Sequence, residues 1–352
     1  MTRLDDHGFA GGFSLAFGDV EFDPDSDSPD GTRSGSNQAG VAPIASFSYA
    51  HKVSDRVRFV FSFFSISGSI LSPSNNWAGR SQMTDLSLLT ISMTPTLAVR
   101  LADWVSIGGG PVVTYGVLNW DLRAPSEDFI RLNDLDDWEA SGRIGLVLHP
   151  RDDFSVSVFY NSKTDFSLNG EFNGPAGLAP SLGLDLPLAQ FVEVSAYWQT
   201  TEKIALLATF NWEDWSVADD LSVQIGPAPA INATTGFKDT YKVAVGANYQ
   251  LNEDWLLQTG LAYDTSALQN KNRIAALPID EQIRFSLGGV YGLTESTNLG
   301  LSFVYLNLGQ GEIRTGQLRG DYERNHAFIL GLSLAFKELP WAGKWTYERD
   351  PS

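Results

Sequence analysis

The sequence predicts an all-β, membrane-spanning antiparallel β-barrel of about fourteen strands, and three observations support this prediction. Apolar and polar residues alternate with period two in many segments, and the connections between these segments alternate between short and long. No stretch is apolar enough for a membrane-spanning helix. Because barrel strands alternate lipid-facing and lumen-facing residues, a mean hydropathy of -0.11 agrees with a barrel.

Period-two alternation marks each predicted strand. In the segment that starts at Val57, Phe59 and Phe61 share one face, whereas Arg58 and Val60 lie on the other. The predicted strands start near Phe9, Val41, Val57, Leu86, Val105, Trp138, Phe154, Gln190, Ile204, Thr240, Trp255, Gln282, Asn298 and Arg324. Their even number would return both ends of the chain to the same side of a membrane.

The connections between the predicted strands differ in length in a regular way. The short connections lie within residues 51–55, 101–103, 150–153, 200–203, 251–254 and 294–297. The long connections span residues 23–37, 70–82, 121–136, 161–189, 217–238, 265–281 and 309–323. Short periplasmic turns and long outer loops are expected of an outer-membrane barrel. A water-soluble β-sandwich or propeller also alternates apolar and polar residues, but it gives no reason for this asymmetry.

The composition argues against several kinds of site. The formal net charge of -18 opposes binding of nucleic acid through its phosphates. The chain has no cysteine and its four histidines are isolated, so no zinc signature and no catalytic histidine is predicted. We therefore expect no enzymatic activity, no catalytic residue, no metal and no cofactor. The acidic segment 23–31 resembles a calcium loop, but its glycine is displaced, and a solvated acidic loop is the other interpretation.

Several stretches of the chain resemble segments typical of FadL-type outer-membrane transporters. The stretches are residues 184–188 (LDLPL), 211–216 (NWEDWS), 236–246 (GFKDTYKVAVG), 254–255 (DW), 260–264 (GLAYD), 272–273 (NR) and 284–288 (RFSLG). The resemblance is clearest between Phe154 and Phe336. It implies uptake of long-chain fatty acids or other hydrophobic compounds through the outer membrane of Gram-negative bacteria.

The resemblance also implies a particular architecture. It comprises a fourteen-stranded barrel, an N-terminal hatch, an apolar capture groove among the outer loops, an inner pocket, and lateral exit beside an inward-kinked strand. The family hatch ends in Asn-Pro-Ala-Gly, commonly followed by an apolar residue and Thr-Arg-Leu, and residues 1–4 (MTRL) would complete that pattern. We therefore expect that the assigned start codon lies downstream of the true one. The expected parts are a hatch remnant at 1–7, the barrel at 8–336 and a C-terminal periplasmic tail at 337–352.

Two groups of residues are candidates for ligand binding. The connection 161–189 is unusually apolar, and exposed apolar surface often marks a binding site, although packing of the loop over the barrel mouth is the other interpretation. Its candidate ligand contacts are Phe172, Leu178, Leu182 and Leu184. The second group is basic, and alternation places it inside the barrel, where it would anchor a carboxylate or pair with acidic neighbours. Its members are Arg58, Arg143, Lys242 and Arg284.

These expectations combine into one functional hypothesis, passive uptake with capture by the outer loops, a pocket in the barrel and lateral exit to the bilayer. Hydrocarbon uptake, of alkanes or monoaromatics, is the alternative within transport, because residues 232–235 (NATT) lack a base that fatty-acid-handling relatives carry. An outer-membrane enzyme or a structural barrel is the alternative of another class. The expected partners of the monomeric barrel are its hydrophobic ligand, membrane lipid, lipopolysaccharide and the barrel assembly machinery, but not nucleic acid.

Overall fold

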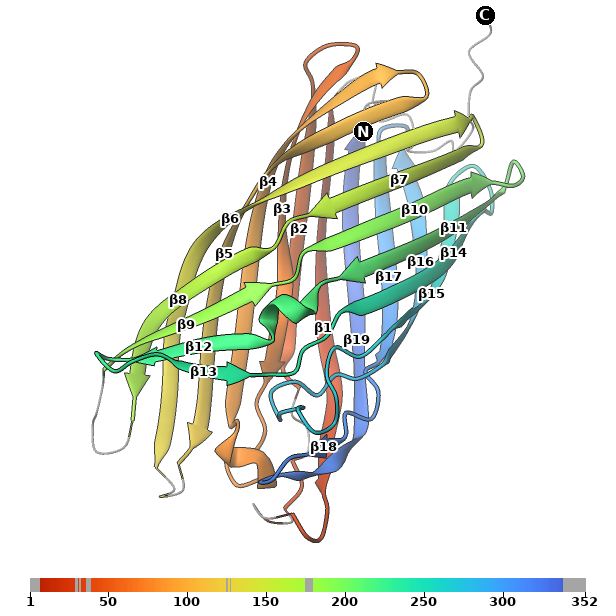
Figure 1. Ribbon diagram of the computed structural model, residues 1–352. Coiled ribbons are helices and arrows are strands. Elements are labelled where there is room, and N and C mark those ends of the chain that lie inside the picture. The colour runs from red at the N-terminus through yellow and green to blue at the C-terminus, as the bar shows by residue number, and fades with distance from the viewer. Residues whose placement is uncertain are drawn as a thin grey trace, which may run out of the picture.

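Fourteen strands form a closed antiparallel ring in the computed structural model, which describes residues 7–28, 31, 33–35, 39–124, 126, 128–174 and 180–337 (Figure 1). In ring order they are β1 (Gly8–Pro24), β2 (Val41–Lys52), β3 (Val57–Leu71), β4 (Asp85–Ala102), β5 (Val105–Arg123), β6 (Phe129–Arg151), β7 (Phe154–Asn161), β10 (Phe191–Gln199), β11 (Ile204–Glu213), β14 (Thr240–Gln250), β15 (Trp255–Asp264), β16 (Gln282–Thr294), β17 (Thr297–Asn307) and β19 (Arg319–Lys337). Because β19 pairs with both β17 and β1, the ring is closed. The predicted fold class is confirmed.

Further strands extend one side of the wall. They are β8 (Thr164–Asn173), β9 (Ser181–Leu188), β12 (Asp220–Ile225) and β13 (Ile231–Thr234), and they pair in the order β6, β8, β9, β12, β13. The short β18 (Ile313–Arg314) pairs with β19. Two 3-10 helices are described, η1 (Ala78–Ser81) and η3 (Trp215–Ala218).

Among the described residues, no helix is both long enough and apolar enough to span a membrane.

The two faces of the wall differ as the alternation predicts. Large apolar side chains point outward and are about half exposed, such as Phe13 at 50% and Leu332 at 49%. Small residues face the lumen on the same strands, and a side chain at Gly331 would collide with the hydroxyls of Ser14 and Ser302. The outer face is therefore suited to lipid and the inner face leaves room inside the barrel.

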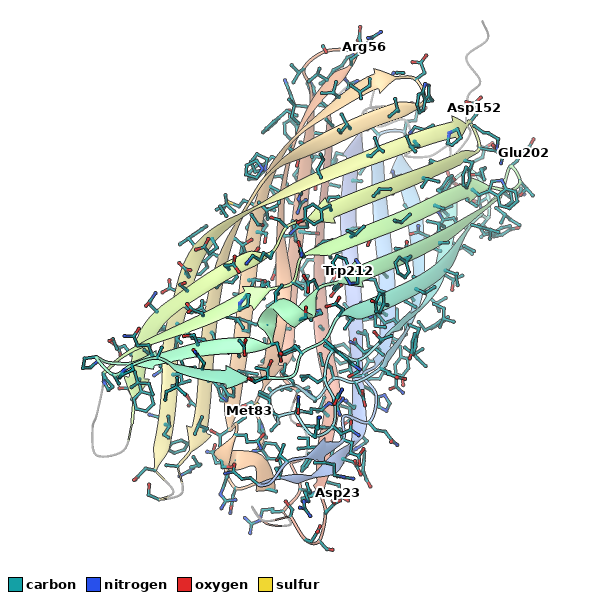
Figure 2. The ribbon with its side chains drawn as sticks, in the orientation of Figure 1. Asp23, Arg56, Met83, Asp152, Glu202 and Trp212 are labelled. Carbon is teal, nitrogen blue, oxygen red and sulfur yellow. The ribbon has the colours of Figure 1, made fainter. Side chains whose placement is uncertain are left out.

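The two ends of the barrel differ in their connections. One end, called here the short-turn end, carries Arg56, Asp152 and Glu202 in tight turns, and β1 begins and β19 ends there, with Gly8 opposite Lys337 (Figures 1 and 2). The opposite end, called here the long-loop end, carries Asp23 and Met83 (Figure 2). The predicted asymmetry of connection lengths is thus observed.

Four of the predicted long loops contain strands instead, and one of them, 309–323, contains β18 and the first residues of β19. The connection 121–136 was expected to be loop, but β6 begins at Phe129 because a bulge opposite Asn119 absorbs Asn133 and Asp134. Asp134 has a positive φ of 51°, and its backbone N–H donates to Asn119 Oδ1 at 2.8 Å. Such a bulge shifts the face on which later residues lie, so the period-two pattern breaks there. The connections 161–189 and 217–238 contain the hairpins β8–β9 and β12–β13.

Candidate ligand path

A buried apolar cluster occupies the long-loop end, and we call it the mouth cluster. It combines the ends of several strands with the connections 72–84, 265–281 and 308–318. Its buried members are Val20, Phe22, Leu71, Trp77, Ala78, Met83, Leu86, Leu118, Leu135, Phe166, Leu168, Leu182, Leu184, Ala275, Ala276, Ile313, Leu318 and Tyr322. Loops that lie far apart in the sequence therefore share one apolar interior.

Three aromatic residues join the loops within the mouth cluster. The ring of Phe22 meets Trp77 edge-on at 5.7 Å and Tyr322 at 5.1 Å between centroids. The indole N–H of Trp77 donates to the carbonyl of Met83 at 2.8 Å, and the hydroxyl of Tyr322 donates to the carbonyl of Ala275 at 2.9 Å. Because the polar atoms of Trp77 and Tyr322 have hydrogen-bond partners, the cost of desolvating them is largely offset.

A fully buried arginine holds two of the loops together. Arg273 Nη2 lies 2.8 Å from Asp280 Oδ1, and its Nη1 donates to the Glu312 carbonyl at 2.7 Å. Its Nε donates to the Ile279 carbonyl at 3.2 Å, and Asn270 Oδ1 accepts a further bond from Nη1 at 2.9 Å. A buried cation with this many partners fixes the conformation of the segments 265–281 and 308–318.

The apolar candidates of the connection 161–189 lie at the mouth cluster. Leu182 and Leu184 of β9 are buried members, and Phe172 of β8 packs against the cluster with partial burial. Leu178 lies outside the described residues. These three side chains pack at the barrel mouth, as the second interpretation of this segment predicted. Their contact with a ligand is a proposal.

The wall contains an unpaired stretch between β2 and β3. Their ladder runs from Lys52↔Arg58 to Ser46↔Phe64 and resumes only at Ala39↔Leu71, where the Gly40 N–H donates to the Ile70 carbonyl at 3.0 Å. Residues 41–45 and 65–69 are unpaired with each other, although the register on both sides of the stretch agrees. We call this stretch the β2–β3 gap.

The sequence around the β2–β3 gap accounts for its position. Pro43 cannot donate a ladder hydrogen bond, so it suits a strand edge that lacks a neighbour. On β3 the ladder with β4 shifts between Ser67 and Ile70, so that one extra residue of β3 is accommodated by a bulge. The resemblance implied a kinked strand without identifying it, and the missing pairs lie between β2 and β3. Pro43 and the Ser-Gly-Ser stretch 67–69 are the sequence signals at this position.

Three of the four basic candidates already have partners. Arg58 is buried at the short-turn end, where it donates to the carbonyls of Ser54 and Val57. Arg284 Nη2 lies 2.9 Å from Asp264 Oδ2, and Lys242 stands directly opposite Asp264 in the β14–β15 ladder. Pairing with an acidic neighbour therefore describes Arg284, whereas the hydrogen bonds of Arg58 go to backbone carbonyls.

Arg143 differs from the other basic candidates. Its guanidinium carbon lies 5.5 Å from the ring centroid of Phe64 and 5.4 Å from that of Phe159. No carboxylate in the described part of the chain forms an ion pair with Arg143, and its buried Nε has no hydrogen-bond partner there. Aromatic faces stabilise a guanidinium while leaving its N–H edges available to an anion. Phe64 is also the last β3 residue paired with β2 before the β2–β3 gap.

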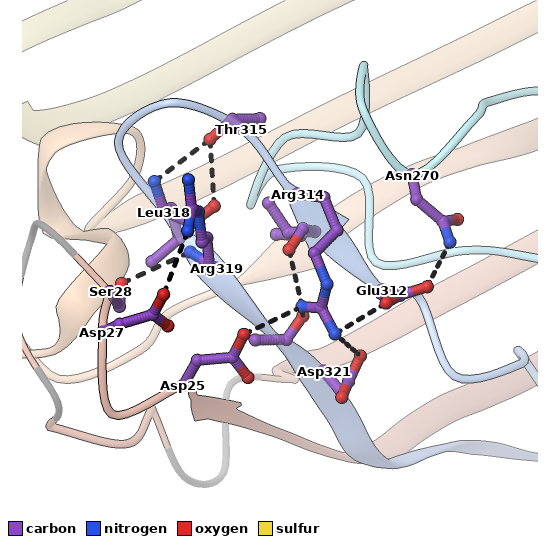
Figure 3. A network of polar contacts seen from close by, with 12 residues as sticks. Asp25, Asp27, Ser28, Asn270, Glu312, Arg314, Thr315, Leu318, Arg319 and Asp321 are labelled. Carbon is purple, nitrogen blue, oxygen red and sulfur yellow. Dashed lines mark hydrogen bonds and ion pairs between the residues drawn. The ribbon is translucent and has the colours of Figure 1, made fainter.

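The acidic segment near Asp23 is held by arginines (Figure 3). Arg319 Nη1 lies 3.0 Å from Asp27 Oδ2, and Arg314 reaches Asp25 at 3.4 Å and Glu312 at 2.6 Å. These carboxylates are therefore partly neutralised. Among the described residues no group of three or more histidine, aspartate or glutamate side chains is placed to bind a metal ion.

Taken together, the closed fourteen-stranded ring, the lipid-suited outer face and the mouth cluster define an outer-membrane β-barrel with an apolar outer end. The model of the family "Outer membrane protein transport protein (OMPP1/FadL/TodX)" matches residues 1–337, so the chain belongs to this family of outer-membrane transport proteins.

Curated relatives match about half of the chain. The 47 kDa outer membrane protein of Pasteurella multocida is 25% identical over 189 residues, covering 49% of this chain and 44% of the relative. The long-chain fatty acid transport protein of Escherichia coli K12 is 23% identical over 190 residues, covering 51% of this chain and 42% of the relative. The matched part therefore spans less than half the length of these relatives.

Solved structures match nearly the whole chain in fold. A FadL homologue of Pseudomonas aeruginosa has a TM-score of 0.86 at 18% identity, covering 95% of this chain and 91% of that one. The toluene transporter TodX of Pseudomonas putida has a TM-score of 0.74 at 15% identity, covering 95% and 90%. At these identities the likeness extends to the fold alone.

Proposed function

We propose that the protein is a passive outer-membrane transporter for long-chain fatty acids or similar hydrophobic molecules, and not an enzyme. The observation that carries the proposal is the β2–β3 gap beside an aromatic, cationic surface inside the barrel. Family membership supports transport, and the curated relatives include long-chain fatty acid transport proteins.

The proposed path has three steps. An apolar ligand first enters the long-loop end, where Phe172, Leu182 and Leu184 lie. It then moves along the lumen to Arg143, and finally leaves through the β2–β3 gap into the bilayer. Burial of apolar area at about 25 cal/mol per Å² supplies the driving force without an energy source. Lateral exit spares the ligand from crossing the aqueous periplasmic side.

Arg143 is the proposed contact for a carboxylate head group. A fatty acid bound there would place its carboxylate on the N–H edges of the guanidinium and its chain along Phe64 toward the β2–β3 gap. Of the four basic candidates, Arg143 alone combines aromatic neighbours with the absence, among the described residues, of an acidic partner. Lys242 and Arg284 contribute positive charge to the lumen near Asp264.

Hydrocarbon uptake is the second candidate, and a specific observation favours it. The mouth cluster consists of apolar side chains, and the segment 232–235 carries no base. An apolar entrance of this kind would accept a neutral alkane or monoaromatic as readily as a fatty acyl chain. The solved structures with a similar fold include two toluene transporters, which supports hydrocarbon uptake as the second candidate.

Uptake by cells tests the proposal. A deletion strain with and without the restored gene would be given labelled oleate, labelled hexadecane and labelled toluene. Restoration of oleate uptake is the expected result, and restoration of hydrocarbon uptake alone would establish the second candidate. Restoration of neither would overturn the proposed function.

The expected partners also remain part of the proposal. Insertion of the barrel requires the barrel assembly machinery, and the outer face would contact membrane lipid and lipopolysaccharide. We propose a monomer, because each of the fourteen strands of the closed ring pairs with a neighbour on both sides, and only the short β2–β3 gap leaves strand edge unpaired.

A further inference from the structure

The outer face of the barrel carries a hollow at the long-loop end, separate from the ligand path. Its volume is about 720 Å³, within the usual range of small-molecule sites of roughly 300–1,000 Å³. Its floor includes Tyr263, Ile283 and Asn307, which stand side by side on β15, β16 and β17. Tyr263 and Ile283 are 42% and 50% exposed and belong to the outward face. The hollow therefore opens toward the membrane and not into the lumen.

Aromatic residues place this hollow at the boundary of the bilayer. On the outward face of β15, Trp255 and Tyr263 stand at the two ends, with Leu257 and Leu261 between them. In outer-membrane barrels such rings mark the two interfaces of the apolar band. Since Tyr263 marks the interface at the long-loop end, the hollow above it lies at the level of the lipid head groups of the outer leaflet.

The charges around the hollow favour an anion. Lys238 and Lys271 line it, both are exposed, and neither has an ion-pair partner in the part of the chain that the structure describes. Of the two acidic residues of the lining, Asp280 pairs with Arg273 at 2.8 Å, and Glu281 accepts a hydrogen bond from the hydroxyl of Tyr263, so the two lysines leave the hollow with an excess of positive charge. Two lysines above the outward-facing Tyr263 and Ile283 match a phosphorylated head group with acyl chains below it.

We propose that this hollow is a binding site for lipopolysaccharide, the phosphorylated glycolipid of the outer leaflet. Lys238 and Lys271 contact its phosphates, whereas Tyr263, Ile283 and the buried Leu268 contact the upper part of its acyl chains. The loop 265–281, which supplies much of the rim, also contributes to the mouth cluster through Ala275 and Ala276. A lipid bound in the hollow therefore rests against the same loop that covers the mouth of the barrel.

Retention of lipopolysaccharide during purification tests the site. The protein would be extracted from outer membranes in mild detergent, and the glycolipid carried by each barrel would be counted by native mass spectrometry. At about tenfold per 1.4 kcal/mol and about 1 kcal/mol for each lysine near an anionic surface, the double variant Lys238→Gln with Lys271→Gln should bind about thirtyfold more weakly. The control is Lys203→Gln, an exposed lysine in a short turn at the other end, which should retain the wild-type amount.

A second measurement separates this site from general lipid binding. Lipid-depleted wild-type protein would receive intact lipopolysaccharide, dephosphorylated lipopolysaccharide, phosphatidylglycerol or inorganic phosphate, and the thermal midpoint would be followed. Only the intact glycolipid should raise the midpoint, and the double variant should lose that shift while keeping the heat-modifiable mobility of a folded barrel. Equal retention by the double variant, or an equal shift with phosphatidylglycerol, phosphate or the dephosphorylated form, would overturn the proposal.

Discussion

The two edges of strand β2 differ in how completely they pair with the neighbouring strands. Toward β1, the ladder is unbroken from Gly8↔Ala50 to Phe17↔Val41. Toward β3, the ladder stops at Ser46↔Phe64, and residues 41–45 have no partner until the bridge at Ala39↔Leu71. Residues 41–45 are therefore competent to form a strand, and the β2–β3 gap coincides with the shift in the β3–β4 ladder between Ser67 and Ile70. A barrel can thus open sideways without losing the strand that borders the opening.

Closing the β2–β3 gap should have the largest effect on uptake. The chain contains no cysteine, so the pair Ala45→Cys with Ser65→Cys, the next positions in register beyond Ser46↔Phe64, introduces a single possible disulfide. Oxidation should draw the edges together and reduce uptake of oleate to that of cells lacking the gene, and reductant should restore it.

The control for this cross-link lies in the paired part of the same two strands. The hydroxyl oxygens of Ser48 and Ser62 are 2.7 Å apart, so a disulfide between cysteines at these positions should leave uptake unchanged. Unchanged uptake in the oxidised Ala45→Cys, Ser65→Cys protein would show that ligands do not leave through the gap.

Replacing the buried Arg273 should have the next largest effect, which is a loss of folding free energy. Arg273→Met leaves Asp280 and the Glu312 carbonyl without their partner, and breaking a buried ion pair typically costs about 3–5 kcal/mol. Urea denaturation in detergent would measure the loss. Arg319→Gln is the matched control, because its exposed pair with Asp27 should contribute less than about 1 kcal/mol.

A cavity in the mouth cluster should have a smaller effect than loss of Arg273. Leu182 is 2% exposed, so Leu182→Ala should lower the free energy of unfolding by about 2–4 kcal/mol. Leu330→Ala on the lipid-facing side, where the residue is 52% exposed, should cost clearly less. Similar losses for the two variants, measured by the same denaturation, would mean that the cluster is loosely packed.

Replacing Arg143 should separate fatty acids from hydrocarbons. A hydrogen bond to a charged group contributes about 1.5–3 kcal/mol, so Arg143→Met should lower oleate uptake by about tenfold or more. Hexadecane uptake should stay near the wild-type rate, because an alkane has no head group to bind. Arg284→Gln, at an arginine that is already paired with Asp264, should affect oleate less. An equal fall for both substrates in Arg143→Met would point to damage of the path instead of loss of an anchor.

The sequence predicted the ring of strands well because most of its strands keep strict alternation. Val57, Val105, Phe154, Ile204, Thr240 and Trp255 were expected to start strands, and each does. The start of β6 was placed at Trp138 instead of Phe129, because the bulge at Asp134 moves residues from one face to the other. Alternation of apolar and polar residues reports only which face of the sheet each residue occupies. A prediction based on it therefore ends a strand wherever a bulge changes that face.

The candidate site was less accessible to sequence reasoning. Alternation placed Arg143, Lys242 and Arg284 in the lumen, but it could not tell that Asp264 pairs with Arg284 whereas Arg143 lies between two phenylalanines. Those contacts depend on how strands distant in the sequence lie around the ring. The hatch remnant and the tail were assigned to residues 1–7 and 337–352, of which residues 1–6 and 338–352 lie outside the described residues.

The most direct test of lateral exit is to label the residues that a ligand touches while it leaves. Cells would take up palmitate with a diazirine at the end of its chain, and after brief illumination the adducts would be mapped by mass spectrometry. Adducts on residues 41–45 and 65–69 are the predicted result. Adducts confined to the lumen at the short-turn end, around residues 57–60 and 147–151, would show that the ligand leaves along the barrel axis and would contradict lateral exit.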